Sequence, residues 1–293
     1  MIAHRHAEPQ NPARVVLLGA RGFIGSALLK HLKISGMEAL GLTSREVDLV
    51  SADAPGRLAG LLKPSDSIVM LAALTPDKAR DAAALMKNLS MMQNVCAAIE
   101  KTGCAHFVYF SSDAVYGLAV ARVSEETPAA PQDLYGVMHL TREMMAKGLA
   151  KVPVLILRPT LVYGAGDTHN AYGPNRFRRA AQKDGKIQLF GGGEETRDHI
   201  HVDDVAELAR RCLQRGSTGT LNIATGRSLS FHDVAHLVAR QFRGTVEVVA
   251  TPRANPITHR HYDPTNLLKA FPDYRFIGLD EGVARCHRET SDG

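Results

Sequence analysis

Short apolar segments alternate with amphipathic ones along most of this chain. The apolar segments have the length of strands and cover residues 14–19, 38–43, 67–73, 106–112 and 152–159. The last of them is almost wholly apolar, which is typical of a strand covered on both faces. The segments between them have the apolar period of helices. Strands that alternate with helices predict an α/β fold with a doubly wound parallel sheet, in a Rossmann-like arrangement.

The longest amphipathic segment predicts a helix over residues 76–102. Thr75 is suited to be its N-cap and Pro76 its first residue, because the first turn of a helix needs no backbone N–H from proline. Apolar residues then recur every three or four positions, and Gly103 follows as a stop signal. A further helix is predicted around Tyr135.

The alternation breaks from Tyr163 to about Gln188, where a glycine- and arginine-rich loop is expected. It then resumes with a helix at 201–216, a strand at 220–225, a helix at 231–242 and a strand at 245–250. This order predicts two domains, the second of them small, discontinuous and C-terminal. The predicted division gives residues 13–162 plus 199–228 to dinucleotide binding, and residues 163–198 plus 229–293 to substrate binding.

The composition describes an ordinary globular protein. Of the 293 residues, 45% are hydrophobic and 22% are charged. The start of the chain has no apolar core of signal-peptide length, and no apolar run approaches the roughly 18 residues that cross a bilayer. Four scattered cysteines do not suggest a disulfide scaffold. We therefore expect a cytoplasmic protein with reduced thiols and no membrane partner.

A net charge of +5 has two interpretations, a mildly basic surface or a site for a phosphorylated ligand. The densest basic run is "NRFRRAAQK" at 175–183, and no aromatic platform accompanies it. Since single-stranded nucleic acids are usually bound by basic grooves that contain stacking aromatics, we expect no nucleic-acid partner.

The sequence "GARGFIG" places Gly19, Gly22 and Gly25 between a predicted strand and a predicted helix. The first glycine would make a tight turn, the second would let the backbone approach a pyrophosphate, and the third would allow close packing of helix and strand. The helix N-terminus would add N–H donors for the phosphates. The alternative is a plain turn between strand and helix, but the context favours a dinucleotide site.

The glycine spacing resembles that of the short-chain dehydrogenase/reductase superfamily. "GFIG" is similar to its extended branch, the NAD-dependent epimerase/dehydratase type, whose members mostly modify nucleotide-linked sugars. Other segments follow in that family's order, namely "MLAA", "SSDAVYG", "YGVMH", "RPTLVYGAGD" and "RDHIHVDDVA". The resemblance implies cofactor contacts from these residues: Gly19, Arg21, Gly22, Phe23, Ile24, Gly25, Thr43, Ser44, Arg45, Asp48, Leu71, Ala72, Ala73, Tyr135, His139, Pro159 and Val162.

The end of the second predicted strand bears on the choice of cofactor. In the family, NAD users usually have aspartate there, and this sequence has Thr43. A carboxylate would repel a 2′-phosphate, whereas Arg45 and Arg21 could bind one with bidentate geometry. We therefore expect NADP(H) rather than NAD(H), the alternative being that both arginines are simply solvated. Asp48 is expected near the adenine.

The resemblance implies that Tyr135 is the acid/base on a sugar hydroxyl or ketone and that Ser112 orients the same oxygen. Asp113 stands where dehydratases of the family place an acid. Their next residue is a glutamate base, and here it is Ala114. Dehydration is therefore disfavoured, and a 4-keto reductase or a 4-epimerase is expected.

Tyr135, His139 and Glu143 are four residues apart, so they share one face of the predicted helix. The family has lysine where this chain has His139. Lysine lowers the pKa of the tyrosine, and a neutral imidazole would not. This favours a slow reductase, in which a neutral tyrosine donates its proton. The rival from another class is a non-catalytic dinucleotide-binding sensor or scaffold.

The resemblance implies that Arg197 binds the diphosphate of a nucleotide-sugar substrate, with Asn175 as a softer candidate. The alternative for Arg197 is an ion pair with Asp203 or Asp204. "HIHVDD" (199–204) also resembles the start of a metallohydrolase site, but the surrounding residues match the sugar-nucleotide family better. We therefore predict no metal site.

Methionines gather on the two predicted helices at 76–102 and 133–150. They are suited to fill irregular gaps in a core. The resemblance implies instead that these helices pair with their mates across a twofold axis, which predicts a homodimer.

Overall fold

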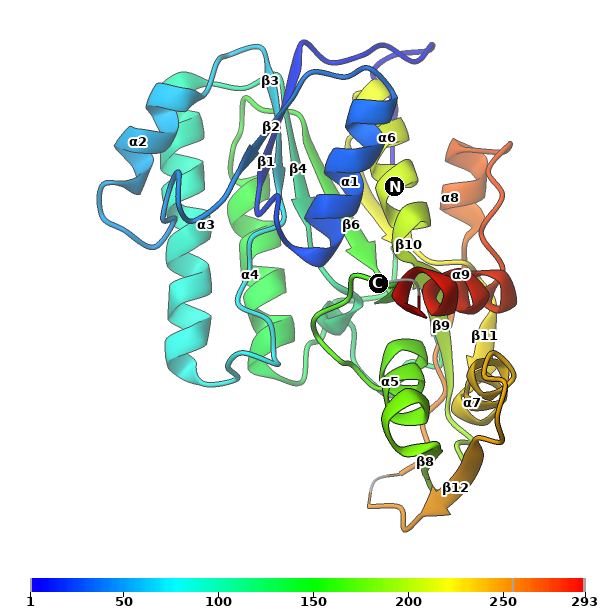
Figure 1. Ribbon diagram of the computed structural model, residues 1–293. Coiled ribbons are helices and arrows are strands. Elements are labelled where there is room, and N and C mark those ends of the chain that lie inside the picture. Colours follow the sequence, from blue (N-terminus) through cyan, green and yellow to red (C-terminus); the bar gives the residue numbers. More distant parts are fainter. Residues whose placement is uncertain (1, 255, 292–293) are drawn as a thin grey trace.

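The computed structural model describes residues 2–254 and 256–291. Within this part, the centre is a six-stranded sheet in which all neighbouring strands are parallel, in the order β10-β6-β4-β3-β1-β2 (Figure 1). The order reverses at β1, as in a doubly wound fold, so the predicted fold class is confirmed. The strands are β1 (Arg14–Leu18), β2 (Ala39–Leu42), β3 (Asp66–Met70), β4 (His106–Phe110), β6 (Val154–Pro159) and β10 (Gly219–Ile223).

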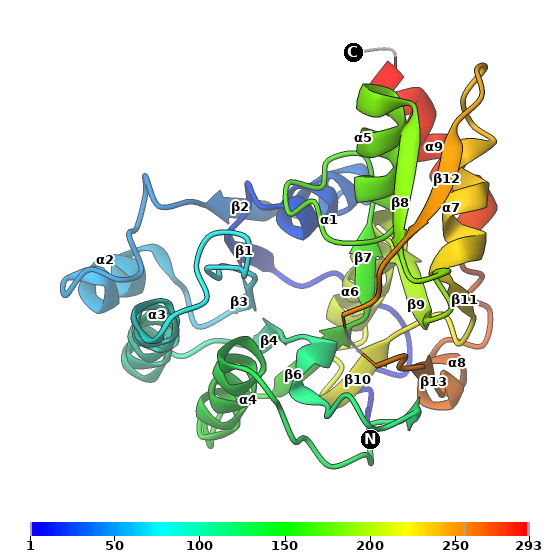
Figure 2. The same ribbon diagram turned by 90° about the horizontal axis from the view of Figure 1, so that it is seen from below.

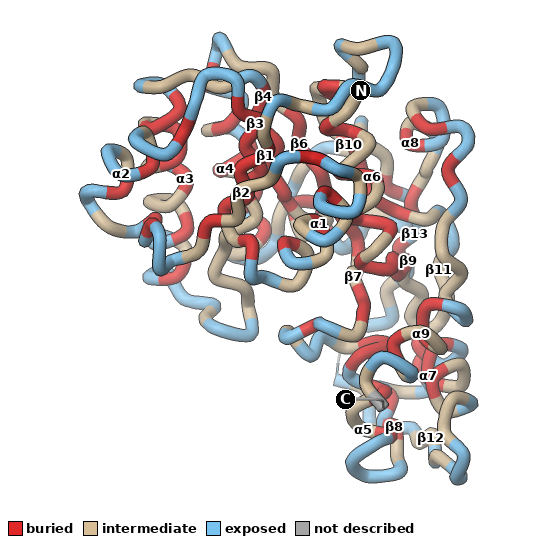
Figure 3. Tube along the Cα trace, turned by 45° about the horizontal axis from the view of Figure 1, so that its top comes forward, coloured by how far each residue is buried: buried red, intermediate tan, exposed pale blue. Residues whose placement is uncertain are grey.

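Helices cover both faces of this sheet, as Figure 2 shows. On one face lie α1 (Phe23–Ile34) and α6 (Val202–Gln214); on the other lie α2 (Ala54–Leu61), α3 (Ala82–Thr102) and α4 (Leu134–Lys147). Alternate residues of β1 serve the two cores, because successive side chains of a strand point to opposite faces. Val15 and Leu17 belong to one core, and Val16 and Leu18 to the other. This is why the central strands read as continuous apolar runs, and they are the buried centre in Figure 3.

A smaller assembly lies beyond the carboxyl ends of the strands, at the lower right of Figure 1. Its core gathers Phe177, Ile187, Phe231, Val234 and Cys286. Its helices and strands are β7 (Leu161–Tyr163), α5 (Pro174–Asp184), β8 (Lys186–Phe190), β9 (Thr196–His201), β11 (Ser228–Ser230), α7 (Phe231–Ala239), β12 (Glu247–Thr251) and α9 (Leu279–Ser291).

The segment before α9 returns to the large sheet. The short strand β13 (His261–Tyr262) pairs with β5 (Arg122–Val123), and α8 (Thr265–Ala270) follows. Leu267, Phe271 and Tyr274 then pack into the core beside α1 and α6. This crossing brings residues near position 260 next to the loop that follows β4.

Two local predictions are wrong. The helix predicted from Pro76 begins at Ala82, because the carboxylate of Asp81 accepts a hydrogen bond from Ala84 N and caps the helix there. The stretch predicted as loop contains helix α5. Its boundaries are marked by Pro174 in the first turn and by Gly185, whose left-handed conformation ends it.

Candidate active site

The glycine turn has the close contacts that its three glycines were expected to serve. Gly19 has a positive φ of 96°, and a Cβ there would lie 2.8 Å from the backbone nitrogen of Ala72. A Cβ on Gly25 would collide with the carbonyl oxygen of Gly19, so only glycine lets α1 pack this closely. Gly22 caps α1 without a side-chain hydrogen bond, and the first turn holds no acidic residue. These features fit the phosphates of a dinucleotide.

The other residues predicted for the cofactor lie around this turn. Gly19 N donates to Leu42 O at the end of β2, and Ala72 N donates to Leu18 O at the end of β1. The ring of Phe23 lies against Gly164, just after β7. The structure therefore brings the glycine turn, the end of β2 and the segment after β3 together. In the same region, Leu71 and Ala73 flank Ala72, Ile24 follows Phe23, Pro159 ends β6 and Val162 lies in β7.

Glu46 brings a carboxylate to the end of β2, beside Thr43. The backbone N–H and the hydroxyl of Thr43 donate to Glu46 Oε2 at 2.8 and 2.6 Å. The hydrogen bond from this hydroxyl is the main reason that the pKa of Glu46 is lowered. The expectation of NADP(H) assumed that no carboxylate stood at this position. Glu46 therefore weighs against a 2′-phosphate, while Arg21 and Arg45 are exposed and weigh for it.

Two other residues predicted beside the adenosine are also at the surface. Ser44 and Asp48 are both exposed. The Asp48 carboxylate accepts a hydrogen bond from Val50 N at 3.1 Å, which shapes the turn after β2.

Asp113 begins the short helical turn Asp113–Val115 that follows β4, and Ser112 caps this turn. Ser112 Oγ accepts a hydrogen bond from Ala114 N at 3.1 Å. Asp113 Oδ2 accepts from the hydroxyl of Tyr262 at 2.8 Å and lies 3.8 Å from Arg260 Nη1. Burial raises the pKa of Asp113, and Arg260 opposes that shift. Asp113 is thus anchored to the segment at 260–262.

Tyr135 is half-buried near the start of α4, and its surroundings keep it protonated. Burial raises the pKa of Tyr135, and the nearby Asp113 raises it further. The ring of His139 meets the Tyr135 ring edge-on, with 4.6 Å between their centroids. At neutral pH Tyr135 is therefore a phenol, able to donate a proton.

His139 is buried, and its polar edge faces β4. Its Nδ1 lies 2.7 Å from the hydroxyl of Tyr109, and its Nε2 has no hydrogen-bond partner among the described residues. Burial and the charge of Arg142 lower the pKa of His139 to about 3. The imidazole is therefore neutral across the physiological range.

Glu143 shares this side of α4, as predicted, but it belongs to the scaffold. It is fully buried and forms a bidentate ion pair with Arg158, with contacts of 2.8 and 2.6 Å. Ser111 Oγ also donates to Glu143, at 2.6 Å. These bonds fix α4 against the ends of β4 and β6, and so fix the position of Tyr135.

Arg197 and Arg260 form a basic centre beside Asp113. Arg197 donates to the carbonyl and hydroxyl of Thr258, both at 2.7 Å, so neither Asp203 nor Asp204 is its partner. Burial and the charge of Arg260 lower the pKa of Arg197. Arg260 is buried, and its Nη2 donates to the carbonyl of Gly117 at 2.8 Å. Guanidiniums are suited to bind a diphosphate. Arg260 was not predicted from the sequence, because the segment around it has no periodic pattern.

Asn175 is buried at the start of α5, where its amide donates to Asp167 Oδ2 at 2.9 Å. This contact positions the start of α5. His201 caps α6 by accepting from Asp203 N. His199 is buried against Phe231, and neither of its ring nitrogens has a partner in the described structure. No group of three or more metal-ligating side chains occurs among the described residues.

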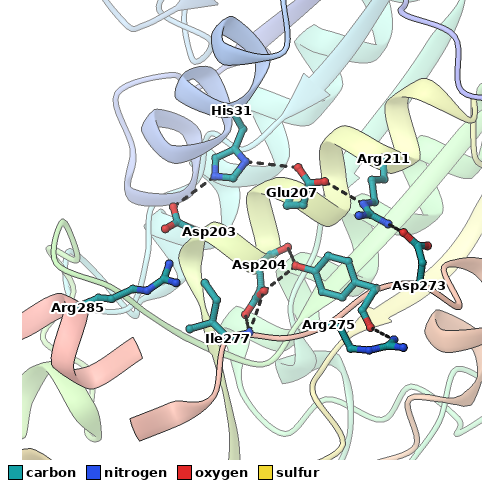
Figure 4. Close-up of a pocket in the computed structure, with 10 residues that line it drawn as sticks. His31, Asp203, Asp204, Glu207, Arg211, Asp273, Arg275, Ile277 and Arg285 are labelled. Carbon is teal, nitrogen blue, oxygen red and sulfur yellow. Dashed lines mark hydrogen bonds and ion pairs between the residues drawn. The ribbon is translucent and has the colours of Figure 1, made fainter. Parts of the chain in front are cut away.

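A hollow of about 410 Å³ lies elsewhere, between α1, α6 and the segment that precedes α9 (Figure 4). Hydrogen bonds to Asp203 and Glu207 raise the pKa of His31 there to about 9. The Tyr274 hydroxyl donates to Asp204 at 2.6 Å. None of the residues predicted for the cofactor or substrate lines this hollow, so its contacts tie helices together outside the candidate active site.

None of the helices in the described ranges combines the length and the apolar character that a membrane span requires.

The chain matches the family described as "NAD dependent epimerase/dehydratase family" over residues 15–224. Solved structures share the fold over nearly its whole length. MoeE5, in complex with UDP-glucose and NAD, is 26% identical, with a TM-score of 0.81 over 95% of this chain and 99% of that one.

Two further structures are similar in fold. RMD from Pseudomonas aeruginosa, complexed with NADPH, is 23% identical, with a TM-score of 0.82 over 96% of this chain and 100% of that one. TunA, an NAD dependent-NDP-hexosamine 5,6-dehydratase involved in tunicamycin biosynthesis, is 22% identical, with a TM-score of 0.83 over 96% of this chain and 98% of that one. The proteins similar to this chain therefore include users of NAD and of NADPH.

Proposed function

Because this chain belongs to the NAD dependent epimerase/dehydratase family, we propose that it is an oxidoreductase that acts on a nucleotide-linked sugar. Within that class we favour a 4-keto reductase over a 4-epimerase. The observation that carries this proposal is the setting of Tyr135, which is half-buried and meets the neutral ring of His139 with 4.6 Å between the ring centroids. Burial and Asp113 raise the pKa of Tyr135 in this setting.

The chemistry requires a proton to move as hydride moves at the adjoining carbon. A bound nicotinamide would supply or accept the hydride. In the proposed reduction, Tyr135 donates its phenolic proton to the oxygen of the ketone. Ser112, at the end of β4, orients that oxygen. Oxidation of an alcohol needs the phenolate instead, which a raised pKa makes scarce.

The fold does not separate reduction from dehydration, because TunA is a dehydratase with the same fold. The distinction proposed here rests on Ala114, which stands where dehydratases of this type are expected to have a glutamate base. Alanine cannot remove a proton from carbon. Asp113 could still contact the substrate from its position beside Arg260.

We propose that Arg197 and Arg260 bind the diphosphate of the substrate, and that Asn175 contributes by shaping the start of α5. Arg197 lies in β9 of the smaller assembly, and Arg260 lies just before β13. We propose the division into residues 13–162 plus 199–228 for dinucleotide binding and residues 163–198 plus 229–293 for substrate binding, although Leu267, Phe271 and Tyr274 pack into the core of the dinucleotide-binding part. The cofactor is a nicotinamide dinucleotide. We propose NADP(H) rather than NAD(H), because Arg21 and Arg45 could bind the 2′-phosphate. The carboxylate of Glu46 would repel that phosphate and is the argument against this choice.

The second candidate is a non-catalytic dinucleotide-binding protein. It is favoured by one observation, the inward position of His139, which leaves no cation at the place of the family's lysine. Binding of dinucleotide without turnover would support it.

The deciding experiment mixes purified protein with NADPH or NADH and a panel of 4-keto nucleotide sugars, and follows absorbance at the nicotinamide band. A reductase consumes the reduced cofactor, and an epimerase interconverts sugars without net oxidation. Tyr135→Phe should abolish turnover while the melting temperature and dinucleotide binding are kept. Full activity in Tyr135→Phe would contradict the proposed function.

A further inference from the structure

Arg142 is a fully buried cation on the helix that carries Tyr135. It lies seven residues after Tyr135, and its side chain is 0% exposed. Its Nε donates to the carbonyl of Asn88 at 2.8 Å, and its Nη1 donates to the carbonyl of Ala72 at 2.9 Å. Its Nη2 is buried without a hydrogen-bond partner among the described residues. None of the acidic side chains of the described structure forms an ion pair with it.

A charge in this position is costly to the fold. Removing a guanidinium from water costs several kcal/mol unless an anion and a full set of hydrogen bonds compensate it. The two carbonyl acceptors of Arg142 offset only part of this desolvation cost, because neither is an anion. A neutral side chain would cross-link α3 and α4 more cheaply, so cross-linking alone does not account for an arginine here.

The location of Arg142 points to the reacting centre. Ala72 belongs to the segment that contacts Gly19 of the glycine turn, and Asn88 holds the next part of that segment by two hydrogen bonds to Leu74. Arg142 therefore fastens the cofactor-side loop to the helix of Tyr135. Its guanidinium also lies beside the hydroxyl of Tyr109. That hydroxyl is 2.7 Å from His139 Nδ1, and the His139 ring meets the Tyr135 ring with 4.6 Å between their centroids. The charge of Arg142 lowers the pKa of both tyrosine hydroxyls.

The neighbouring His139 cannot provide this charge. It is neutral, and Arg142 itself helps to keep it so. The sequence thus has a neutral residue where the family has lysine, and a buried cation three residues later on the same helix.

We propose that Arg142 supplies the positive charge near Tyr135 that a lysine at position 139 would supply, and that it is a positioning residue for proton transfer at Tyr135. This inference rests on the proposed function. The charge acts through space on the Tyr135 hydroxyl and through the pair of Tyr109 and His139.

Other charged groups also face Tyr135. Asp113 after β4, Asp133 at the cap of α4 and Asp77 in the loop before α3 all raise its pKa. The charge of Arg142 lowers the pKa of Tyr135 and so acts against these three carboxylates. Its removal should therefore shift the titration of Tyr135 upward, by about half a pH unit or more.

The test measures this titration directly. A fluorinated tyrosine incorporated at position 135 has a more acidic phenol, so that its ionisation can be followed by absorbance without any substrate. Arg142→Gln keeps hydrogen-bond donors and loses the charge, whereas Arg142→Lys keeps the charge. We expect the pKa at position 135 to rise by about half a unit or more in Arg142→Gln and by much less in Arg142→Lys. In the double variant Arg142→Gln with His139→Lys, the new lysine restores a cation, so the pKa at position 135 should fall again.

Equal pKa values in the parent and in Arg142→Gln, with only a lower melting temperature, would show a merely structural arginine and overturn the proposal. If Arg142→Gln does not fold, citrulline incorporated at position 142 decides, because it keeps the shape and the hydrogen-bond donors of arginine and has no charge. An unchanged pKa at position 135 with citrulline in place of arginine would overturn the proposal. The titration involves no turnover, so it is independent of the Tyr135→Phe result that tests the proposed function.

Discussion

The Nδ1 atom of His139 lies 2.7 Å from the hydroxyl of Tyr109, a buried residue of β4. The polar edge of the imidazole is therefore committed to the interior. Its Nε2 has no hydrogen-bond partner among the described residues, so a contact between this atom and the cofactor stays a prediction.

Replacing His139 by lysine should favour oxidation over reduction. A lysine at this position adds a cation beside Tyr135, and a nearby cation stabilises the phenolate that alcohol oxidation needs. We predict that His139→Lys raises the initial rate of alcohol oxidation at neutral pH more than the rate of ketone reduction. The two rates are measured with the same sugar pair. An equal change in both would show that the ionisation of Tyr135 does not limit oxidation.

The choice of cofactor depends on opposing charges at the end of β2. Glu46 places a carboxylate beside Thr43, while Arg21 and Arg45 are exposed nearby. We predict that Glu46→Gln strengthens binding of NADPH relative to NADH, because it removes a repulsion between the carboxylate and the 2′-phosphate. Arg21→Ala with Arg45→Ala should have the opposite effect. Fluorescence titrations with both cofactors measure this. Equal losses for NADPH and NADH in the arginine variant would refute the NADP(H) preference.

The sequence predicted the sheet and the glycine turn because both depend on short-range patterns. Central strands buried on both faces read as apolar runs, and close packing at Gly25 admits only glycine. Helix α5 escaped prediction because it contains three arginines, one of which, Arg178, is buried, and only a few apolar residues, such as Phe177 and Ala181, face its core.

The residues of the site that the sequence did not predict depend on contacts that only the fold creates. Arg260 reaches Asp113 only because β13 pairs with β5. Glu46 looks like a turn residue until its carboxylate is seen to bind Thr43. Arg142 occupies a helix position at which a charged residue would be expected to face solvent, and only its burial shows otherwise.

The homodimer predicted through α3 and α4 can be tested at exposed methionines. Met92 and Met138 are core residues, whereas Met86 is 60% exposed and Met144 is 68% exposed. Leu134 and Val137 are exposed apolar residues on α4 as well. We predict a dimer by light scattering at micromolar concentration, and a monomer after Met86→Glu with Met144→Glu.

The control for the dimer test is Ile34→Glu, at the end of α1. Ile34 is 77% exposed and lies on the opposite face of the sheet, so its replacement should leave the dimer intact. A parent protein that is already monomeric would contradict the prediction.

His199 should make the protein sensitive to acid. Burial lowers its pKa to about 4, from about 6.5 in the unfolded chain. The folded state therefore binds fewer protons, and the contribution of His199 to stability is complete above pH 6.5 and is lost as the pH falls toward 4. The loss amounts to at most about 1.4 kcal/mol per pH unit.

We predict that His199→Phe removes this part of the acid sensitivity. By removing two unpartnered buried nitrogens, it should also raise the free energy of unfolding at pH 7 by about 1 kcal/mol. Denaturant titrations at pH 5 and pH 7 measure both effects.

His31 should have the opposite pH dependence. Its ion pairs with Asp203 and Glu207 raise its pKa to about 9, above the 6.5 of the unfolded chain. The folded state therefore binds more protons, so the stabilising contribution is complete below pH 6.5 and is lost as the pH rises through 9. We predict that the melting temperature falls between pH 6.5 and 9 in the parent, and falls less in His31→Gln. His232→Gln, which replaces an exposed histidine on α7, is the matched control and should follow the parent. Parallel curves for His31→Gln and the parent would mean that the contact between α1 and α6 does not depend on the charge of His31.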